Sequence, residues 1–182
     1  SLYLARSALV AASRWASALG LSLNVTADDL EADDFCQRIL GLLVETSVSP
    51  QRLTLEITEQ SLVADIEEAT RKLDDLARLG VRIALDDFGA GFCHFGYLKR
   101  LPLDALKLDR SMVEDVAEQP RDLAVLRGIV AMAKALRLEV VAEGIESEAQ
   151  RVMIVREGCD AWQGFLGAGP MTAAEFSSLA AR

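Results

Sequence analysis

Six short apolar runs, separated by segments with helical spacing, constrain the fold of this 182-residue chain more than any other feature. The runs have the length and composition of β-strands and lie at 21–25, 53–57, 81–87, 103–109, 139–145 and 160–165. Apolar residues recur at intervals of three and four between the runs, which predicts helices at 2–19, 28–46, 61–79, 121–136, 147–157 and 172–181. Strands that alternate with helices predict an α/β fold with a parallel sheet and right-handed crossovers.

Two architectures satisfy this order of elements, an open doubly wound sheet and a TIM-barrel-like (β/α) fold. A complete barrel usually needs about 250 residues, so this chain has room for about six of the eight β/α units. No linker, low-complexity stretch or repeat divides the sequence, and we expect a single domain over residues 1–182.

The composition excludes several classes of protein. A net charge of −9 speaks against binding of a nucleic-acid polymer through a basic face, but it permits a nucleotide ligand that metal ions hold. No apolar stretch approaches the roughly 18 residues of a membrane span, and no signal peptide is visible. The three cysteines, Cys36, Cys93 and Cys159, are odd in number and far apart. We expect them to be small core residues of a protein in a reducing cytoplasm.

Each strand-like run carries a polar residue at or near its C-terminal end. These residues are Asn24, Glu56, Asp86 with Asp87, Lys107 with Asp109, Glu143 and Gln163. In βα folds such ends open onto one face, where ligands bind. Carboxylate and amide oxygens in this number suit hard divalent cations, Mg²⁺ or Mn²⁺. Adjacent acids such as Asp86 and Asp87 can each reach toward a different ion, which removes their mutual repulsion.

Each of these residues also has an ordinary interpretation when it is taken alone. Asn24 is compatible with a helix N-cap, and Glu56 and Glu59 with acids that favour a helix dipole. Asp86 and Asp87 are compatible with an Asx turn. Six polar strand ends on one face make the ordinary interpretation weak for the set as a whole. His94, the one histidine of the sequence, is expected to be a loop residue.

Several motifs together resemble one family. They are "LNVTADDL", "LEITEQSL", "RIALDDFGAGFCHFGYLKRLPLDALKLDRSMV", "VVAEGIES" and "GCDAWQGF". In order, spacing and residue identity they resemble the motifs of the EAL domain of bacterial cyclic di-GMP phosphodiesterases, which is a modified TIM barrel. The resemblance covers essentially the whole chain.

The resemblance implies a role for individual residues. Metal ligands would be Asn24, Glu56, Asp86 and Asp87. Lys107 would lie beside the attacking water, Glu143 would be an active-site acid near the second metal, and Gln163 would help to hold the water and the metal site. The loop with Gly89 and Gly91 would be anchored by Glu59, would order the metal ligands and would contribute to dimer contacts. Supporting residues would be Asp109, Arg110 and Glu146.

The resemblance also implies an activity. The expected reaction is two-metal hydrolysis of cyclic di-GMP to linear pGpG with Mg²⁺ or Mn²⁺, in which Lys107 orients or helps to deprotonate the water. Because carboxylates surround Lys107, we expect it to stay charged and to orient the water. The family further implies a homodimer, a bacterial cytoplasmic location, and a sensory or diguanylate-cyclase domain upstream.

The sequence departs from the family at its start. The early E-A/V-L-x-R motif, which supplies a metal-ligating glutamate and an arginine at the substrate site, is absent. Two strands and a helix of the family pattern are therefore expected to be missing. We expect this chain alone to be weakly active or inactive, and to self-associate through exposed sheet edges or partly misfold. The "FCHFGY" variant of the metal-ordering loop is a smaller departure.

Two other functions remain open at the level of sequence. The first is a catalytically inactive EAL-like module that acts as a cyclic di-GMP receptor or a protein-interaction domain. The second is a barrel enzyme in which Lys107 is a Schiff-base nucleophile, which requires an apolar or cationic neighbourhood. The acidic surroundings of Lys107 argue against the second.

Overall fold

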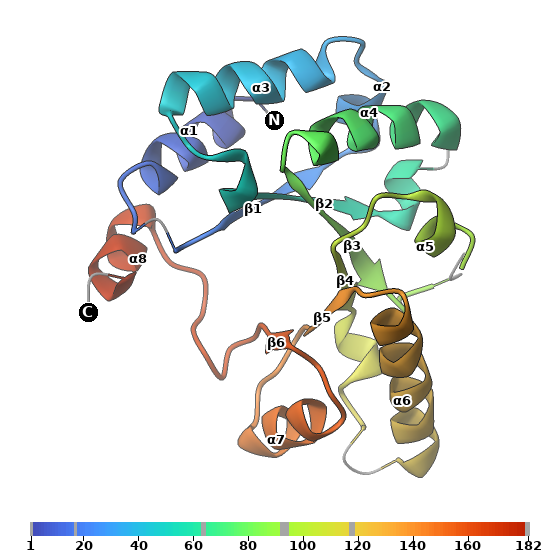
Figure 1. Ribbon diagram of the computed structural model, residues 1–182. Coiled ribbons are helices and arrows are strands. Elements are labelled where there is room, and N and C mark those ends of the chain that lie inside the picture. The colour runs from blue at the N-terminus through green and yellow to red at the C-terminus, as the bar shows by residue number, and fades with distance from the viewer. Residues whose placement is uncertain (1, 17, 63–64, 92–94, 117–118, 181–182) are drawn as a thin grey trace. The chain divides into compact units, whose positions relative to one another are not determined.

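The structure, a computed structural model, describes residues 2–16, 18–62, 65–91, 95–116 and 119–180 (Figure 1). Six strands form one sheet in chain order: β1 (Leu21–Val25), β2 (Leu53–Thr58), β3 (Arg82–Phe88), β4 (Ala105–Leu108), β5 (Glu139–Ala142) and β6 (Ala161–Trp162). The pairings of β1 with β2, β3 with β4, β4 with β5 and β5 with β6 are all parallel. The prediction of an α/β fold with a parallel sheet is confirmed.

Helices alternate with these strands along the chain. The α-helices are α1 (Leu2–Ala12), α2 (Ala27–Glu31), α3 (Phe35–Thr46), α4 (Ile66–Arg78), α5 (Tyr97–Arg100), α6 (Pro120–Ala135), α7 (Glu148–Arg156) and α8 (Ala173–Ala180). The described residues also form three short 3₁₀ helices, each next to a strand in the sequence: η1 (Pro50–Arg52), η2 (Glu59–Leu62) and η3 (Arg110–Met112).

Three of the predicted helices were wrong in their bounds. The helix expected at 61–79 begins at Ile66, with Asp65 as its N-cap, and residues 59–62 form the separate helix η2. The helix expected at 2–19 ends at Ala12, and the guanidinium of Arg52 donates to the carbonyls of Ala12 and Leu19 at 2.8 Å each. The helix expected at 28–46 is two helices, α2 and α3, since the chain turns to an extended conformation at Ala32.

The chain divides into two compact units, which we describe separately. Unit 1 comprises Ser1–Ile83, Arg100–Pro102 and Pro170–Arg182. Alternate residues of β2 are buried, and Leu53, Leu55 and Ile57 are fully inaccessible. The side chains between them, Glu56 among them, therefore lie on the other face of the strand.

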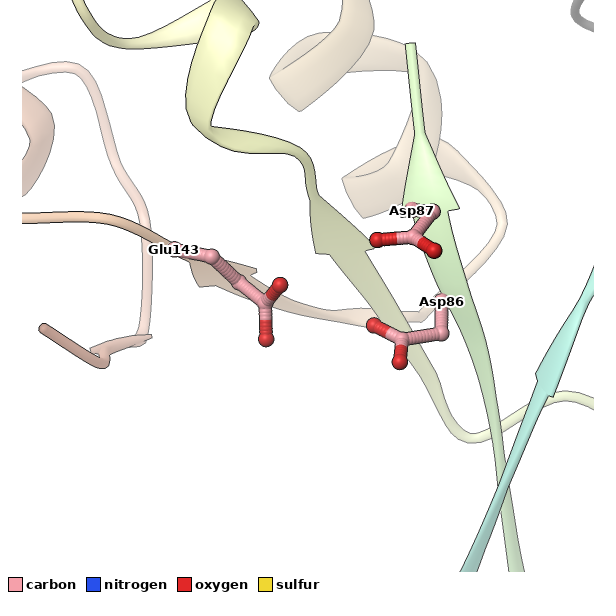
Figure 2. Close-up of side chains that lie close together, drawn as sticks. All are labelled: Asp86, Asp87 and Glu143. Carbon is pink, nitrogen blue, oxygen red and sulfur yellow. The ribbon is translucent and has the colours of Figure 1, made fainter. Parts of the chain in front are cut away.

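Unit 2 comprises Ala84–Lys99 and Leu103–Gly169. All four residues of β4 are buried, as expected for a central strand of a parallel sheet. Backbone bonds continue the ladder beyond the strand ends, since the amide of Asp109 donates to Phe88 and the amide of Glu143 donates to Leu108, at 3.1 and 3.0 Å. The C-terminal ends of β3 and β5 consequently carry their acids to one edge of this unit (Figure 2).

The described cysteines are free thiols that differ in burial. Cys159 is buried in the core, as the sequence predicted, whereas Cys36 is only half-buried. Burial raises the pKa of the Cys159 thiol to about 11, which makes this thiol unreactive at neutral pH. Cys93 and His94 lie outside the described residues. No helix in the described part of the chain combines the length and the apolar character that a membrane crossing requires.

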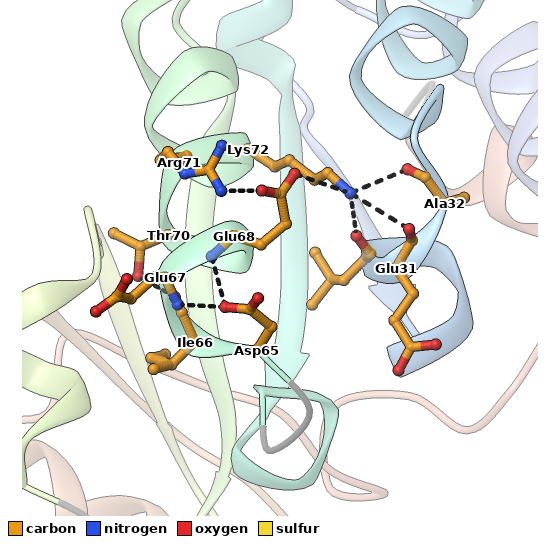
Figure 3. Close-up of polar contacts among 10 residues, drawn as sticks. Glu31, Ala32, Asp65, Ile66, Glu67, Glu68, Thr70, Arg71 and Lys72 are labelled. Carbon is orange, nitrogen blue, oxygen red and sulfur yellow. Dashed lines mark hydrogen bonds and ion pairs between the residues drawn. The ribbon is translucent and has the colours of Figure 1, made fainter.

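Lys72 is a buried lysine that joins two helices of unit 1 (Figure 3). Its ammonium donates to the carbonyls of Leu30 at 2.7 Å and of Ala32 at 3.1 Å, at the C-terminal end of α2. It also lies 3.4 Å from the carboxylate of Glu68, one turn earlier in α4. A cation at this end of α2 satisfies carbonyls that have no partner within the helix and complements the helix dipole.

We predict that Lys72→Met destabilises the protein by about 2–4 kcal/mol, because it leaves buried carbonyls without a donor. The matched control is Arg71→Met, which removes an exposed ion pair with the same Glu68 and is expected to cost less than about 1 kcal/mol. Urea denaturation followed by circular dichroism measures both values. Equal losses for the two variants would contradict this assignment.

Candidate functional site

Strand β3 places two adjacent acids in one site because its ladder is irregular. In a regular strand, neighbouring side chains point to opposite faces. The register of β3 against β4 shifts between Leu85 and Phe88, and Asp86 and Asp87 lie within that bulge. A bulge re-aims a side chain, and here both carboxylates come close to Glu143 (Figure 2).

The backbone of Asp87 is strained. Its φ of 54° lies in the left-handed region, which costs an ordinary residue roughly 1–2 kcal/mol, although aspartate tolerates it better than most. Strain of this kind is characteristic of functional sites, where the surrounding structure holds the chain in place. The sequence pair Asp86–Asp87 suggested a site but not this conformation.

Lys107 lies between the acids of two strands. Its Nζ is 2.8 Å from Oδ1 of Asp86 and 2.7 Å from Oε1 of Glu143, and its side chain is only 7% exposed. Two carboxylates at this distance favour the ammonium form. A Schiff-base lysine needs the neutral amine, so this geometry argues against that function.

Three carboxylates form a cluster that fits a divalent cation. Asp86, Asp87 and Glu143 each offer a ligand oxygen, and these oxygens all lie within 4.8 Å of one another. The buried Oδ1 of Asp86 has no hydrogen-bond partner among the described residues, and its close neighbour is the Lys107 ammonium, which forms an ion pair with it at 2.8 Å. Oxygen ligands in a partly buried cluster are what Mg²⁺, Mn²⁺ and Ca²⁺ bind. The residues present therefore fit the metal that the sequence predicted.

Two further predicted ligands lie together in unit 1. Asn24 of β1 and Glu56 of β2 are register partners, so their side chains leave the sheet side by side on the same face. Asn24 is exposed and Glu56 is half-buried. That these two residues and the unit 2 carboxylates hold common metal ions remains a prediction from the sequence.

The glycines of the loop after β3 differ in their constraints. Gly89 has a φ of 105°, and a Cβ at this position would lie 2.4 Å from Cγ of Met112. Gly91 has open space around its α-carbon. Glu59, the predicted anchor of the loop, begins η2 in unit 1. The "FCHFGY" variant falls partly on residues 92–94, which are outside the described residues.

For two other predicted residues, the structure shows local backbone contacts. Gln163 follows β6, where its amide donates to Ala142 at 2.8 Å and its carbonyl accepts from Ile145 at 3.0 Å, while its side chain is exposed. Asp109 caps η3 through a 3.0 Å bond from the amide of Ser111. Their roles at the metal site stay predictions.

Arg110 and Glu146, both predicted as supporting residues, form an ion pair with 2.8 Å between Nη1 and Oε1. The aliphatic part of Arg110 lies against Gly144, a residue that sequence reasoning did not select. The signal that could have identified it is a glycine directly after Glu143 at a strand end.

Comparison with known proteins agrees with this fold and site. The EAL domain matches residues 2–170. MucR of Pseudomonas aeruginosa, a bifunctional diguanylate cyclase/cyclic di-GMP phosphodiesterase, is 37% identical over 153 residues, which are 84% of this chain and 22% of MucR. The solved PaMucR phosphodiesterase in complex with c-di-GMP has a TM-score of 0.89 at 33% identity, covering 96% of this chain and 72% of that chain. Klebsiella pneumoniae BlrP1 with manganese and cyclic di-GMP has a TM-score of 0.84 at 26% identity, covering 91% of this chain and 43% of that chain.

The chain is therefore a member of the EAL-domain family, and its fold is TIM-barrel-like as the sequence predicted. The chain spans less than half of the length of curated relatives such as MucR and the cyclic di-GMP phosphodiesterase RocR of the same organism.

We predict that Asp87→Gly stabilises the metal-free protein by about 0.5–1 kcal/mol, because glycine adopts a positive φ without strain. The same change is expected to weaken Mn²⁺ binding, since a ligand is lost. Chemical denaturation and titration calorimetry measure the two effects. Asp87→Asn is the control, because asparagine also tolerates this conformation but lacks the charge. A destabilised Asp87→Gly protein would contradict the assignment of strain.

Proposed function

We propose that this chain is a metal-dependent phosphodiesterase domain that hydrolyses cyclic di-GMP to linear pGpG. The observation that carries the proposal is the buried Lys107, held at 2.7–2.8 Å by Asp86 and Glu143 beside a cluster of metal-binding carboxylates. A pure protein-interaction surface has no physical need for such a cluster. Relatives named as cyclic di-GMP phosphodiesterases and complexes with cyclic di-GMP support the choice of substrate.

The proposal gives the residues of the site different roles. Asp86, Asp87 and Glu143 would hold a divalent ion, with Asn24 and Glu56 as the further ligands that the resemblance predicts. When bound, divalent ions activate water and offset the charge on phosphoryl oxygens. The preferred ion, Mg²⁺ or Mn²⁺, belongs to the proposal, as does the homodimer that the family implies.

Lys107 would act through its charge and its orientation. An ammonium has three donor protons, and two carboxylates fix the direction in which those of Lys107 point. It would orient the attacking water and stabilise negative charge that develops on the phosphoryl group. Since its carboxylate neighbours favour the charged form, we assign it no role as a free base.

The test is turnover of cyclic di-GMP by the purified protein with Mn²⁺, followed by chromatography of the nucleotides. We expect pGpG to form, EDTA to stop its formation, and added Mn²⁺ to restore it. Lys107→Met should lower kcat by about 10²-fold or more, because a positioned charge at the reacting centre is lost. Lys99→Met, which changes an exposed lysine of α5, should leave kcat unchanged.

Two outcomes would overturn the proposal in different ways. Binding of cyclic di-GMP without turnover, detected by calorimetry, would make this chain a receptor for the nucleotide. Absence of binding in a protein that is folded by circular dichroism would remove the nucleotide from its function altogether.

A further inference from the structure

The turn of residues 143–147, which follows β5, begins with an acid of the carboxylate cluster and ends at the first residue before α7. We call it the Glu143 turn. Its backbone is tied at four amides: Glu143 donates to Leu108 at 3.0 Å, Ile145 to Gln163 at 3.0 Å, and Glu146 and Ser147 to the side chain of Gln150 at 2.9 and 3.0 Å. The residue between the first two, Gly144, has a φ of 68°. The Glu143 turn thus has no regular secondary structure, although it carries the Glu143 carboxylate, which has to keep one position in the cluster.

The aliphatic part of Arg110 packs on the backbone of this turn. A Cβ at Gly144 would lie 2.6 Å from Cγ of Arg110 and 2.7 Å from its Cβ. No larger residue than glycine fits between Arg110 and the turn, so the arginine stem covers the residue that directly follows Glu143. Arg110 itself comes from η3, three residues after Lys107.

The guanidinium of Arg110 holds the far end of the same turn. It pairs with Glu146 at 2.8 Å and with Glu114 at 3.4 Å. Glu146 directly precedes Ser147, the N-cap of α7, where Ser147 and Gln150 form a capping box. One side chain therefore joins the segment after β4 to both the start and the end of the turn that carries Glu143.

We propose that Arg110 is a positioning residue that clamps the Glu143 turn and thereby fixes the carboxylate of Glu143 in the cluster with Asp86 and Asp87. The inference rests on the proposed function only for its effect on metal binding and turnover. The clamp itself is a property of the metal-free protein.

Because Arg110 and Glu146 are partly exposed, an effect of Arg110 on the position of the turn can be told apart from an effect on global stability. The side chains of Arg110 and Glu146 are 51% and 41% exposed, and ion pairs of that exposure contribute little to global stability. Loss of Arg110 should therefore leave the unfolding midpoint nearly unchanged, while the turn gains freedom. A ligand that is slightly misplaced is costly for metal binding and for catalysis, which tolerate little error in geometry.

The first experiment uses hydrogen exchange of the metal-free protein. In Arg110→Met, the amides of Ile145 and Glu146 should exchange about fivefold faster than in the wild type, because local opening of the turn loses an ion pair. The amides of Leu106 and Lys107 in β4 should not change. Unaltered exchange at Ile145 and Glu146 would overturn the clamp, whatever the protein does with nucleotides.

The second experiment measures Mn²⁺ affinity by titration calorimetry with the metal alone, and then kcat and KM with cyclic di-GMP. Arg110→Met should weaken Mn²⁺ binding by about tenfold, the range found when a residue that orients a metal ligand is removed. At saturating Mn²⁺, kcat should fall more than KM rises. Arg110→Lys, which keeps the stem and one ion pair, should restore most of both losses.

The control is Arg127→Met, which removes an ion pair elsewhere in unit 2. Arg127 pairs with Glu157 at 2.5 Å, and the two side chains are 56% and 7% exposed. Loss of Arg127 leaves a nearly buried carboxylate without this partner, so it is expected to cost at least as much stability as loss of Arg110. The pair joins α6 to the end of α7, away from the Glu143 turn. Arg127→Met should change neither the hydrogen exchange of the turn amides nor the affinity for Mn²⁺. Equal effects from Arg127→Met and Arg110→Met would overturn the proposal in favour of general loosening. A wild-type protein that binds no Mn²⁺ would refute the proposed function, and the exchange result would still decide the clamp.

Discussion

Mutual repulsion among Asp86, Asp87 and Glu143 is the constraint that the described site has to satisfy. Their ligand oxygens lie within 4.8 Å of one another, and one of the carboxylates is buried. Lys107 supplies a positive charge from the strand between them, within ion-pair distance of two of the three. Burial of Lys107 is tolerable only because those partners are present. The acids and the lysine therefore depend on each other, and β4 is the strand that brings them together.

The positions of the strands could be predicted from the sequence because local pattern and tertiary burial agree. β1 has the same bounds in the prediction and in the structure, and the apolar alternation of β2 directly becomes its buried face. The helix ends were less predictable. Arg52 donates to the carbonyl of Ala12, the last residue of α1, from 40 residues away, and Lys72 donates to the end of α2 from another helix. Long-range donors of this kind leave no mark in the local spacing of apolar residues.

The site, like the fold, could be predicted only in part from the sequence. Acids at strand ends predicted a cluster, and Asp86, Asp87, Lys107 and Glu143 do lie together. The bulge that turns two neighbouring acids to one side could not be inferred, because a regular strand would separate them. Arg110 was predicted only as a supporting residue, and its contacts could not be predicted because its partners Gly144 and Glu146 belong to a segment more than 30 residues away. Motifs identify which residues matter, whereas only the structure gives the contacts between them.

The left-handed backbone of Asp87 has an evolutionary consequence. Single base changes convert an aspartate codon to glycine or asparagine, and these are the residues that accept a positive φ most readily. At this position, two mutations that remove the carboxylate are also ones that the backbone accommodates. A lineage released from selection for the carboxylate cluster therefore has a short path toward a folded EAL domain that lacks it.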